Sequence, residues 1–193
     1  MKLVLSTDNK NKIKEIKDVL KDLDIEILGK SDVGCDFEVE ENGDTLYDNA
    51  LLKAQAIADK TDFYVLADDT GLFVNSLGGD PGVHSARYAS EHNDKLNREK
   101  LLKNLSDSED RSAYFKTELV LIDPDKNIIP IEGICEGNII EEERGDNGFG
   151  YDSIFMPLGY DKTFAEMTLD EKNKISHRSR ALQKLKIKLT KIK

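Results

Sequence analysis

Residues 64–71 of this chain read Tyr64-Val65-Leu66-Ala67-Asp68-Asp69-Thr70-Gly71. The apolar run up to Ala67 predicts a short buried strand that leads straight into two carboxylates. Carboxylates at the end of such a strand are costly to bury unless cations or donors meet them, and divalent cations meet that need. Neighbouring side chains of a strand point to opposite faces, so we expect Asp68 and Asp69 to do different work. A turn or a helix cap at the strand end is the alternative interpretation.

A strand, a polar loop and a helix are predicted at the start of the chain. Residues 3–5 are apolar, and the cluster Ser6-Thr7-Asp8-Asn9 that follows favours turns and helix caps. Ile13, Ile16 and Leu20 then recur at helical spacing. Such a loop presents backbone N–H groups at the N-terminus of a helix, which is a favourable place for a phosphate group.

The remaining patterns mix strands and helices irregularly. Strands are predicted at residues 25–28, 112–123 and 153–155, with one or two more within residues 128–140. Helices are predicted from Thr45, at residues 94–105, from Thr168 and at the C-terminal end. Because strict strand–helix alternation is missing, we expect a mixed α/β fold. Its sheet would be twisted, partly antiparallel and flanked by helices, with two lobes around a central cleft. We expect residues 1–193 to form a single domain.

Composition and charge narrow the class of protein. Apolar residues make up 38% of the 193 residues and charged residues 34%, a balance typical of a globular chain. The formal net charge of −10 argues against nucleic acid and anionic membranes as partners, because binding them needs clustered Lys and Arg. No signal-peptide core is visible, and no run approaches the roughly 20 apolar residues of a membrane span. Cys35 and Cys135 lack zinc-ligand spacing, so we interpret them as reduced thiols of a cytoplasmic protein.

Three further segments carry groups that suit a nucleotide. The acidic stretch Glu38–Glu41 is a candidate source of metal ligands, or else a solvated loop. The run Phe149–Asp152 follows a glycine-rich loop, where an aromatic ring could stack on a base and a carboxylate could accept from its edge. A strand-entry turn with core aromatics fits the same run. Lys172, His177 and Arg178 form a basic patch that suits phosphate or base oxygens, or else a structural histidine with solvated neighbours.

Five segments stand in one order along nearly the whole chain. They are Ser6-Thr7-Asp8-Asn9-Lys10-Asn11-Lys12; Asn49-Ala50-Leu51-Leu52-Lys53-Ala54; Ala67-Asp68-Asp69-Thr70-Gly71-Leu72; Gly78-Gly79-Asp80-Pro81-Gly82 with Ser85-Ala86-Arg87-Tyr88; and Gly148-Phe149-Gly150-Tyr151-Asp152 with Glu171-Lys172 and Ile175-Ser176-His177-Arg178. Each segment is a weak signal alone. Together they resemble the noncanonical purine nucleoside triphosphate pyrophosphatases, the inosine/xanthosine triphosphate diphosphatase type.

The resemblance implies a role for each segment. The first loop would contact the triphosphate through Thr7, Asp8, Asn9, Lys10, Asn11 and Lys12, with Lys53 assisting. Asp69 would be the proton acceptor and, with Glu40, a ligand of Mg²⁺. Thr70 would touch the substrate, Phe149 would stack on the purine, and Gly150, Tyr151 and Asp152 would form the base pocket. Lys172, His177 and Arg178 would read the 6-oxo edge of the purine.

The implied activity is magnesium-dependent hydrolysis of inosine, deoxyinosine and xanthosine triphosphates (ITP, dITP and XTP). Water would attack the α-phosphorus and release the monophosphate and pyrophosphate, which would cleanse the nucleotide pool. The resemblance further implies a cytoplasmic homodimer whose partner is the small-molecule nucleoside triphosphate, with neither nucleic acid nor membrane.

Two alternatives and one departure accompany this resemblance. A related septum-associated pyrophosphatase acts on modified pyrimidine nucleotides, but the motifs at Phe149–Asp152 and His177-Arg178 argue against that type. A non-catalytic nucleotide-binding sensor is the second alternative. The departure is Asp8, which stands where the family usually has Gly. Its carboxylate would repel phosphate groups unless it points away or helps to hold the metal.

Overall fold

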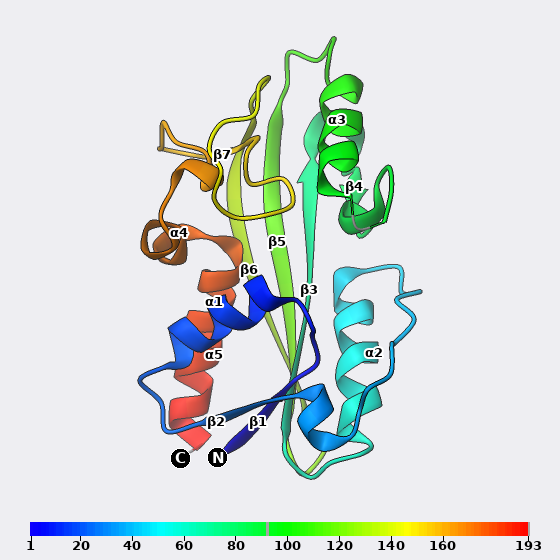
Figure 1. Ribbon diagram of the computed structural model, residues 1–193, viewed down its shortest axis with the longest axis vertical. Coiled ribbons are helices and arrows are strands. Elements are labelled where there is room, and N and C mark those ends of the chain that lie inside the picture. Colours follow the sequence, from blue (N-terminus) through cyan, green and yellow to red (C-terminus); the bar gives the residue numbers. More distant parts are fainter. Residues whose placement is uncertain (92, 193) are drawn as a thin grey trace. The chain divides into compact units, whose positions relative to one another are not determined.

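The structure is a computed structural model that describes residues 1–91 and 93–192 (Figure 1). Its strands are β1 (Lys2–Leu5), β2 (Glu26–Gly29), β3 (Tyr64–Val74), β4 (Pro81–Gly82), β5 (Ser112–Ile122), β6 (Ile128–Ile139) and β7 (Phe155–Pro157). Its α-helices are α1 (Lys10–Leu20), α2 (Leu46–Ala58), α3 (Asp94–Asn104), α4 (Leu169–Ile175) and α5 (His177–Ile192). None of the described helices is long and apolar enough to cross a membrane.

Seven strands of the described chain form one sheet in the order β2-β1-β3-β5-β6-β7, with β4 paired to β3. Strand β1 runs parallel to β2 and β3, whereas β4 pairs with β3 and β7 with β6 in antiparallel fashion. This mixed sheet with flanking helices confirms the predicted fold class. The short predicted strand at residues 153–155 begins later, at Phe155, because the amide of Ile154 closes a turn onto the carbonyl of Tyr151 at 3.1 Å.

Strand β3 continues well beyond the apolar run that predicted it. It extends without a break from Tyr64 to Val74, so Asp68 and Asp69 lie inside the strand. The interpretation of these aspartates as a turn or a helix cap is therefore wrong. The physical reason is that β3 pairs with other strands both before and after the two aspartates. Leu66 aligns with Leu5 of β1, and Leu72 aligns with Gly82 of β4.

The chain divides into two compact units. Unit 1 comprises Met1–Asp69, Thr117–Gly133 and the residues from Arg178 onward, and unit 2 comprises Thr70–Lys116 and Ile134–His177. The boundary therefore passes between Asp69 and Thr70 and again between His177 and Arg178. The single domain and the central cleft expected from the sequence stay predictions.

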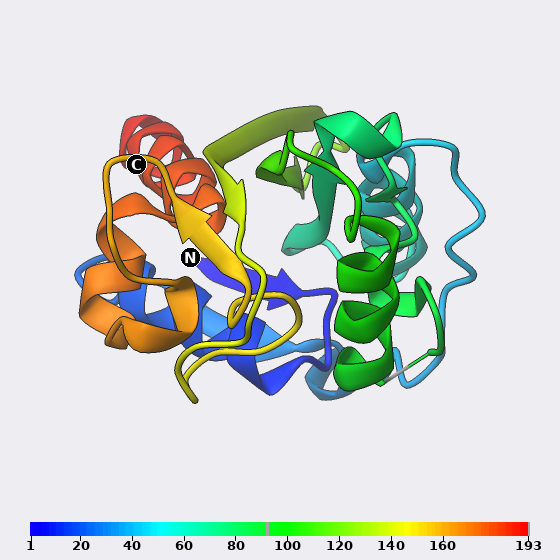
Figure 2. The same ribbon diagram turned by 90° about the horizontal axis from the view of Figure 1, so that it is seen from above.

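Unit 1 is a helix–sheet–helix sandwich. Figures 1 and 2 both show α1 and α5 on one side of β3 and α2 on the other. Alternate residues of each strand pack against the helices on the two sides of the sheet, because successive side chains of a strand point to opposite faces. Leu3, Leu5 and Leu66 pack with α1 and α5, whereas Val4 and Val65 pack with α2. Both faces of β1 are thus buried, as expected for a parallel strand covered by helices.

Two helices, one in each unit, begin where the sequence predicts. The side chain of Thr45 accepts from the amide of Asp48 at 3.1 Å, and the Asp48 carboxylate accepts in return from the amide of Thr45, which opens α2. Thr168 and Glu171 make the same reciprocal pair at the start of α4. Each pair satisfies amides that a helix leaves without an intrahelical partner.

Unit 2 has its own apolar core, built from α3 and the strand segments beyond the boundary. Leu101 and Leu105 of the α3 segment pack with Phe115, Phe155 and Phe164. The close approach of β4 to β3 requires glycine at position 71, because a Cβ there would lie 2.5 Å from the carbonyl oxygen of Gly82. Close packing therefore surrounds the residues that follow Asp69 on β3.

Candidate active site

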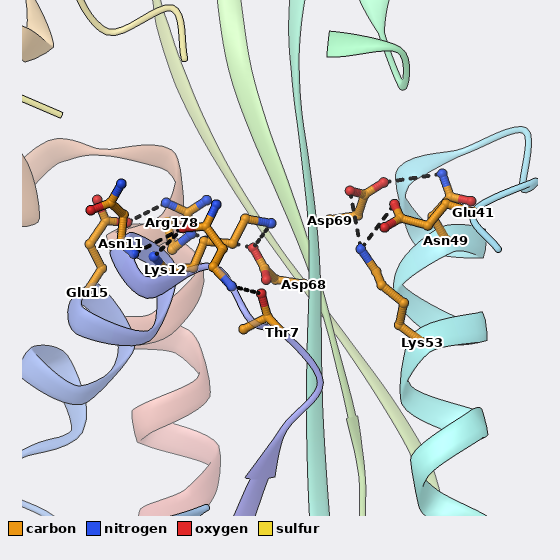
Figure 3. Close-up of polar contacts among 11 residues, drawn as sticks. Thr7, Asn11, Lys12, Glu15, Glu41, Asn49, Lys53, Asp68, Asp69 and Arg178 are labelled. Carbon is orange, nitrogen blue, oxygen red and sulfur yellow. Dashed lines mark hydrogen bonds and ion pairs between the residues drawn. The ribbon is translucent and has the colours of Figure 1, made fainter. Parts of the chain in front are cut away.

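The two consecutive aspartates of β3 are both buried and face opposite sides of the strand. Asp68 is 2% exposed and Asp69 is 8% exposed. Figure 3 shows Asp68 turned toward α1 and α5, and Asp69 turned toward α2. The alternation expected of a strand is thus preserved at this pair. Each carboxylate must be stabilised by a different set of partners, because a buried charge without a partner is costly.

Asp68 belongs to a buried cluster of four charged side chains. Its Oδ2 atom lies 2.9 Å from Nζ of Lys12 and 3.5 Å from Nε of Arg178. The Nη1 atom of Arg178 donates to the carboxylate of Glu15 on α1. Burial alone would raise the pKa of Asp68, but Lys12 and Arg178 outweigh it and lower that pKa to about 2. Asp68 therefore stays ionised and holds two cations in place.

The loop between β1 and α1 carries most of the predicted phosphate contacts. The Oδ1 atom of Asn9 accepts from the amides of Asn11 and Lys12 at 3.0 and 3.2 Å, so Asn9 caps the helix. The hydroxyl of Thr7 accepts from the amide of Asn9 at 3.2 Å. Lys10 at the first position of α1 is exposed. The predicted strand–loop–helix unit is present, while the phosphate contacts of these residues stay predictions.

Asp8, the departure from the family pattern, has a partner of its own. Its Oδ2 atom lies 2.6 Å from Nζ of Lys30, whose ammonium also donates to the carbonyl of Phe37 at 3.0 Å. The Asp8 side chain is 70% exposed. The Asp8 carboxylate, which would repel phosphate, is therefore turned toward a cation. Because Lys30 also binds the carbonyl of Phe37, it joins the loop between β1 and α1 to the segment before α2.

Asp69 faces a second set of polar groups. Its Oδ2 atom accepts from Nδ2 of Asn49 at 3.3 Å, and its Oδ1 atom lies 3.5 Å from Nζ of Lys53. The same ammonium lies 3.2 Å from Oε2 of Glu41. Burial raises the pKa of Asp69; Lys53 and Lys12 oppose that rise, and the charges of Glu41 and Asp68 add to it. Asp69 is thus a carboxylate of increased basicity.

Lys53 remains charged between these carboxylates. Burial alone would lower the pKa of Lys53, but Asp69, Asp68 and Glu41 outweigh burial and raise that pKa. Its backbone is held as well, since its carbonyl accepts from the hydroxyl of Ser6 at 2.9 Å. The predicted site residue Lys53 therefore lies beside Asp69.

The residues around Asp69 fit a hard divalent cation. The carboxylates of Asp69 and Glu41 converge on one ammonium group, which shows that their geometry suits a shared positive charge. Carboxylate oxygens are the ligands that Mg²⁺ prefers. Within residues 1–91 and 93–192, no group of three or more His, Cys, Asp or Glu side chains is arranged as a protein-only metal cage. A cation here would keep water or substrate oxygens in its shell, as Mg²⁺ commonly does.

In the acidic segment Glu38–Glu41, the carboxylate that lies near Asp69 is one residue later than the sequence predicts. Glu40, the predicted ligand, is exposed, whereas Glu41 is half-buried and contacts Lys53. The amide of Gly43 donates to Oδ1 of Asn49 at 2.8 Å, which fixes the segment against α2. The structure therefore brings Glu41 to Asp69, and a ligand role for Glu40 stays a prediction.

In unit 2, two predicted base-pocket residues pair with each other. The Oδ2 atom of Asp152 accepts from Nζ of Lys172 at 2.8 Å and from the amide of Phe149 at 3.0 Å. Both side chains are nearly fully buried. The Lys172 ammonium also lies 5.1 Å from the centre of the Phe149 ring. Position 148 must be glycine, because a Cβ there would lie 2.1 Å from Oδ2 of Asp152.

Two other predicted residues of unit 2 are part of its core. The hydroxyl of Tyr151 donates to the carbonyl of Ser85 at 2.7 Å, and burial raises the pKa of this phenol. The ring of His177 stacks on Phe115, with centroids 4.6 Å apart. Thr70 is half-buried on β3. Base contacts of these residues stay predictions, because the hydrogen bonds and stacking just described are internal to the unit.

Two residues that contribute to the site were missed by sequence reasoning, namely Glu15 and, as a partner of Asp69, Asn49. Glu41 was predicted only as part of the acidic stretch Glu38–Glu41. Glu15 lies beside Ile16 on the buried face of α1, and its partner Arg178 is 163 residues away in sequence. No local pattern distinguishes such a carboxylate from a solvated one. Asn49 stands within one of the five family segments, which was a usable signal.

Known proteins resemble this chain along almost its whole length. The sequence model of the Ham1 family matches residues 3–188.

The chain belongs to the Ham1 family.

Among its relatives, this Ham1 chain is 50% identical over 187 residues to the dITP/XTP pyrophosphatase of Christiangramia forsetii, covering 96% of this chain and 97% of the relative. It is 45% identical to the dITP/XTP pyrophosphatase of Bacillus subtilis, covering 94% and 93%. The Staphylococcus aureus Ham1 protein has a similar structure, with a TM-score of 0.91, 39% identity and full coverage of both chains. A HAM1 protein from Coxiella burnetii gives a TM-score of 0.92 at 38% identity, covering 99% of each chain. These matches confirm the family predicted from the five segments.

The buried cluster around Asp68 predicts a large effect on stability. Replacing Asp68 with Asn would leave two buried cations with one carboxylate fewer, so we expect the free energy of unfolding at pH 7 to fall by about 3 kcal/mol. The matched control is Asp18→Asn, which removes the exposed ion pair with Lys21 on α1 and should cost less than about 0.5 kcal/mol. Equal effects of the two substitutions in urea denaturation would contradict the prediction.

The same cluster predicts a pH dependence. The folded-state pKa of Asp68, about 2, lies below its ordinary value of 3.8. Its stabilising contribution is therefore fully present above pH 3.8 and is lost as the pH falls toward 2. The difference in unfolding free energy between the unaltered protein and Asp68→Asn should therefore be smaller at pH 3 than at pH 7. A constant difference from pH 7 to pH 3 would argue against this electrostatic origin.

The Asp8–Lys30 pair predicts that Asp8 does not hinder phosphate binding. Because Lys30 already offsets the charge, we expect Asp8→Gly to change the affinity for inorganic pyrophosphate, measured by calorimetry, by less than about threefold. Lys12→Met serves as the comparison and should weaken binding by about tenfold or more. A tenfold gain in affinity for Asp8→Gly would show that the carboxylate repels the ligand after all.

Proposed function

We propose that this chain hydrolyses noncanonical purine nucleoside triphosphates, namely ITP, dITP and XTP, to the monophosphate and pyrophosphate. The observation that carries the proposal is the arrangement at β3. The buried Asp69, whose pKa is raised, lies beside Lys53 and Glu41, and Lys12 lies on the opposite face of the strand. It is supported by relatives named dITP/XTP pyrophosphatase that match 94–96% of the chain at 45–50% identity. The class is a hydrolase acting on acid anhydrides, and its role would be to cleanse the nucleotide pool.

Asp69 would hold the water that attacks the α-phosphorus. A carboxylate that burial makes more basic is better able to orient the water and take its proton. Asn49 donates to Oδ2 of Asp69, which fixes the direction of the carboxylate. The proton of the water would pass to Asp69 as the new bond to phosphorus forms, and pyrophosphate would leave.

Asp69 and Glu41 would hold Mg²⁺, with Glu40 as the further candidate from the resemblance. Mg²⁺, when bound, offsets the triphosphate charge and polarises the phosphorus. The Lys53 ammonium lies beside both carboxylates and would turn to a phosphate oxygen when the substrate enters. The oxygen-only donor set supports this choice of metal.

Lys12 would be the cation of the first loop that contacts the triphosphate. Its side chain is 16% exposed, whereas Asp68 behind it is almost fully buried. When Lys12 turns to a phosphate oxygen, Asp68 keeps the guanidinium of Arg178 as a partner. The cluster therefore allows Lys12 to change partners without leaving an isolated buried charge. Thr7, Asn9 and Asn11 would supply hydrogen bonds to the same phosphates.

Unit 2 would recognise the base. The ring of Phe149 would stack on the purine, and the donor groups of Lys172 and His177 would meet the 6-oxo group. An adenine would present an amine at that position, so donor would face donor and buried groups would lose their partners. The pairing of Lys172 with Asp152 supports a fixed position for this ammonium.

The alternatives are less well supported. The similarity to dITP/XTP pyrophosphatases favours a purine over a modified pyrimidine. A non-catalytic sensor would have no need for a carboxylate of raised pKa beside a second carboxylate and a lysine. A cytoplasmic homodimer that contacts neither nucleic acid nor membrane remains our proposal from the family resemblance.

The proposal predicts a preference that can be measured directly. With Mg²⁺ present, we expect kcat/KM for ITP to exceed that for ATP by about 100-fold or more, because a buried donor mismatch at the base is costly. Release of pyrophosphate and monophosphate is the measurement, and a chelator in place of Mg²⁺ is the control. Equal values for the two nucleotides would overturn the base selection, and no pyrophosphate from either would overturn the proposed activity.

A further inference from the structure

Both backbone groups of Gly150 are held by one face of α3. The amide of Gly150 donates to Oδ2 of Asp94 at 2.8 Å, and Nη1 of Arg98 donates to its carbonyl at 2.7 Å. Asp94 and Arg98 are four residues apart on α3, a spacing that places their side chains on the same helix face. These contacts join segments 52 and 56 residues apart within unit 2. The two peptide groups on either side of the Gly150 Cα are thus held by one helix, one by an anion and the other by a cation.

Arg98 is itself fixed from the other side of the glycine-rich loop. Its Nε atom lies 3.0 Å from Oε1 of Glu143, and Oε2 of Glu143 accepts from the hydroxyl of Ser153 at 3.0 Å. The hydrogen bond from Arg98 lowers the pKa of Glu143, with that from Ser153 adding to the effect, so the acceptor stays ionised. Charge-assisted hydrogen bonds of this kind are stronger than neutral ones. Arg98 therefore connects the segments before and after the loop.

The hydrogen bonds of Asp94 and Arg98 with Gly150, which we call the clamp, also restrict the backbone of the neighbouring Phe149. Phe149 donates its own amide to Asp152, so the peptide groups on both sides of its ring are anchored. Gly150 has φ +61°, and no heavy atom lies within 4 Å of where a Cβ would be. Close packing holds the loop at Gly148, where a Cβ would lie 2.1 Å from Oδ2 of Asp152, but not at Gly150. At Gly150 the hydrogen bonds to Asp94 and Arg98 fix the backbone instead.

We propose that Asp94 and Arg98 are positioning residues that hold the Phe149 ring ready to stack on the purine base. They would thereby set the affinity of the enzyme for its substrate, an inference that rests on the proposed function. Asp94 is exposed and Arg98 is half-buried, so these contacts lie at the surface of unit 2 and outside its apolar core. Their contribution is to the order of the loop, because surface ion pairs add little to overall stability.

The kinetic test uses Arg98→Met with Lys95→Met as the matched control. Lys95 lies on the same helix and forms an exposed ion pair with Glu99. We expect Arg98→Met to raise KM for ITP by about tenfold with kcat within about threefold, since the contacts that hold the loop at Gly150 and Glu143 are lost while the groups that contact the substrate remain. Arg98→Lys should restore part of the effect, and Lys95→Met should match the unaltered protein. An unchanged KM, or a fall in kcat alone, would overturn the inference.

Hydrogen exchange tests the clamp without reference to activity. In Arg98→Met and in Asp94→Asn, the amides of residues 149–151 should exchange about tenfold faster while the melting temperature stays unchanged. Exchange as slow as in the unaltered protein would overturn the clamp whatever the substrate proves to be. If the unaltered protein fails to hydrolyse ITP while exchange accelerates in both variants, the proposed function fails and the clamp stands.

Discussion

The arrangement of this site depends on one constraint, the alternation of side chains along β3 at two consecutive buried aspartates. The two carboxylates make direct contacts with different residues, because they face opposite sides of the strand. On one side, Lys12 and Arg178 hold Asp68 ionised, and Glu15 completes a balanced set of two anions and two cations. On the other side, Asp69 contacts Asn49 and Lys53 and has a raised pKa. The ion pairs of Asp68 and the chemistry that we propose for Asp69 thereby lie on opposite faces of a single strand.

Features fixed by short-range patterns could be predicted from the sequence. The capping pairs Thr45 with Asp48 and Thr168 with Glu171 correctly marked two helix starts, because the partners are three residues apart. The opposite directions of the Asp68 and Asp69 side chains followed from the period of two in a strand. The mixed sheet followed from the irregular order of strand and helix patterns. The family followed from five short segments in one order, and the Ham1 match agrees.

Features that depend on distant partners could not be predicted. Strand β3 continues past the aspartates because Leu72 pairs with Gly82, which nothing near residue 72 reveals. The irregular acidic segment has no periodicity, so its sequence could not show that Glu41 rather than Glu40 turns inward. The hydrogen bonds of Asp94 and Arg98 of α3 with Gly150 join residues more than 50 positions apart, and no sequence pattern indicates them. In each case, tertiary contacts selected one of several local possibilities.

The most direct test of the account is the affinity for Mg²⁺, measured by calorimetry with a nonhydrolysable ITP analogue present, in Asp69→Asn and Asp68→Asn. If the two faces of β3 do different work, Asp69→Asn should lose at least about tenfold in affinity, with turnover nearly abolished and the fold retained. Asp68→Asn should bind the metal as the unaltered protein does. Loss of metal affinity in Asp68→Asn, with normal affinity in Asp69→Asn, would contradict the account.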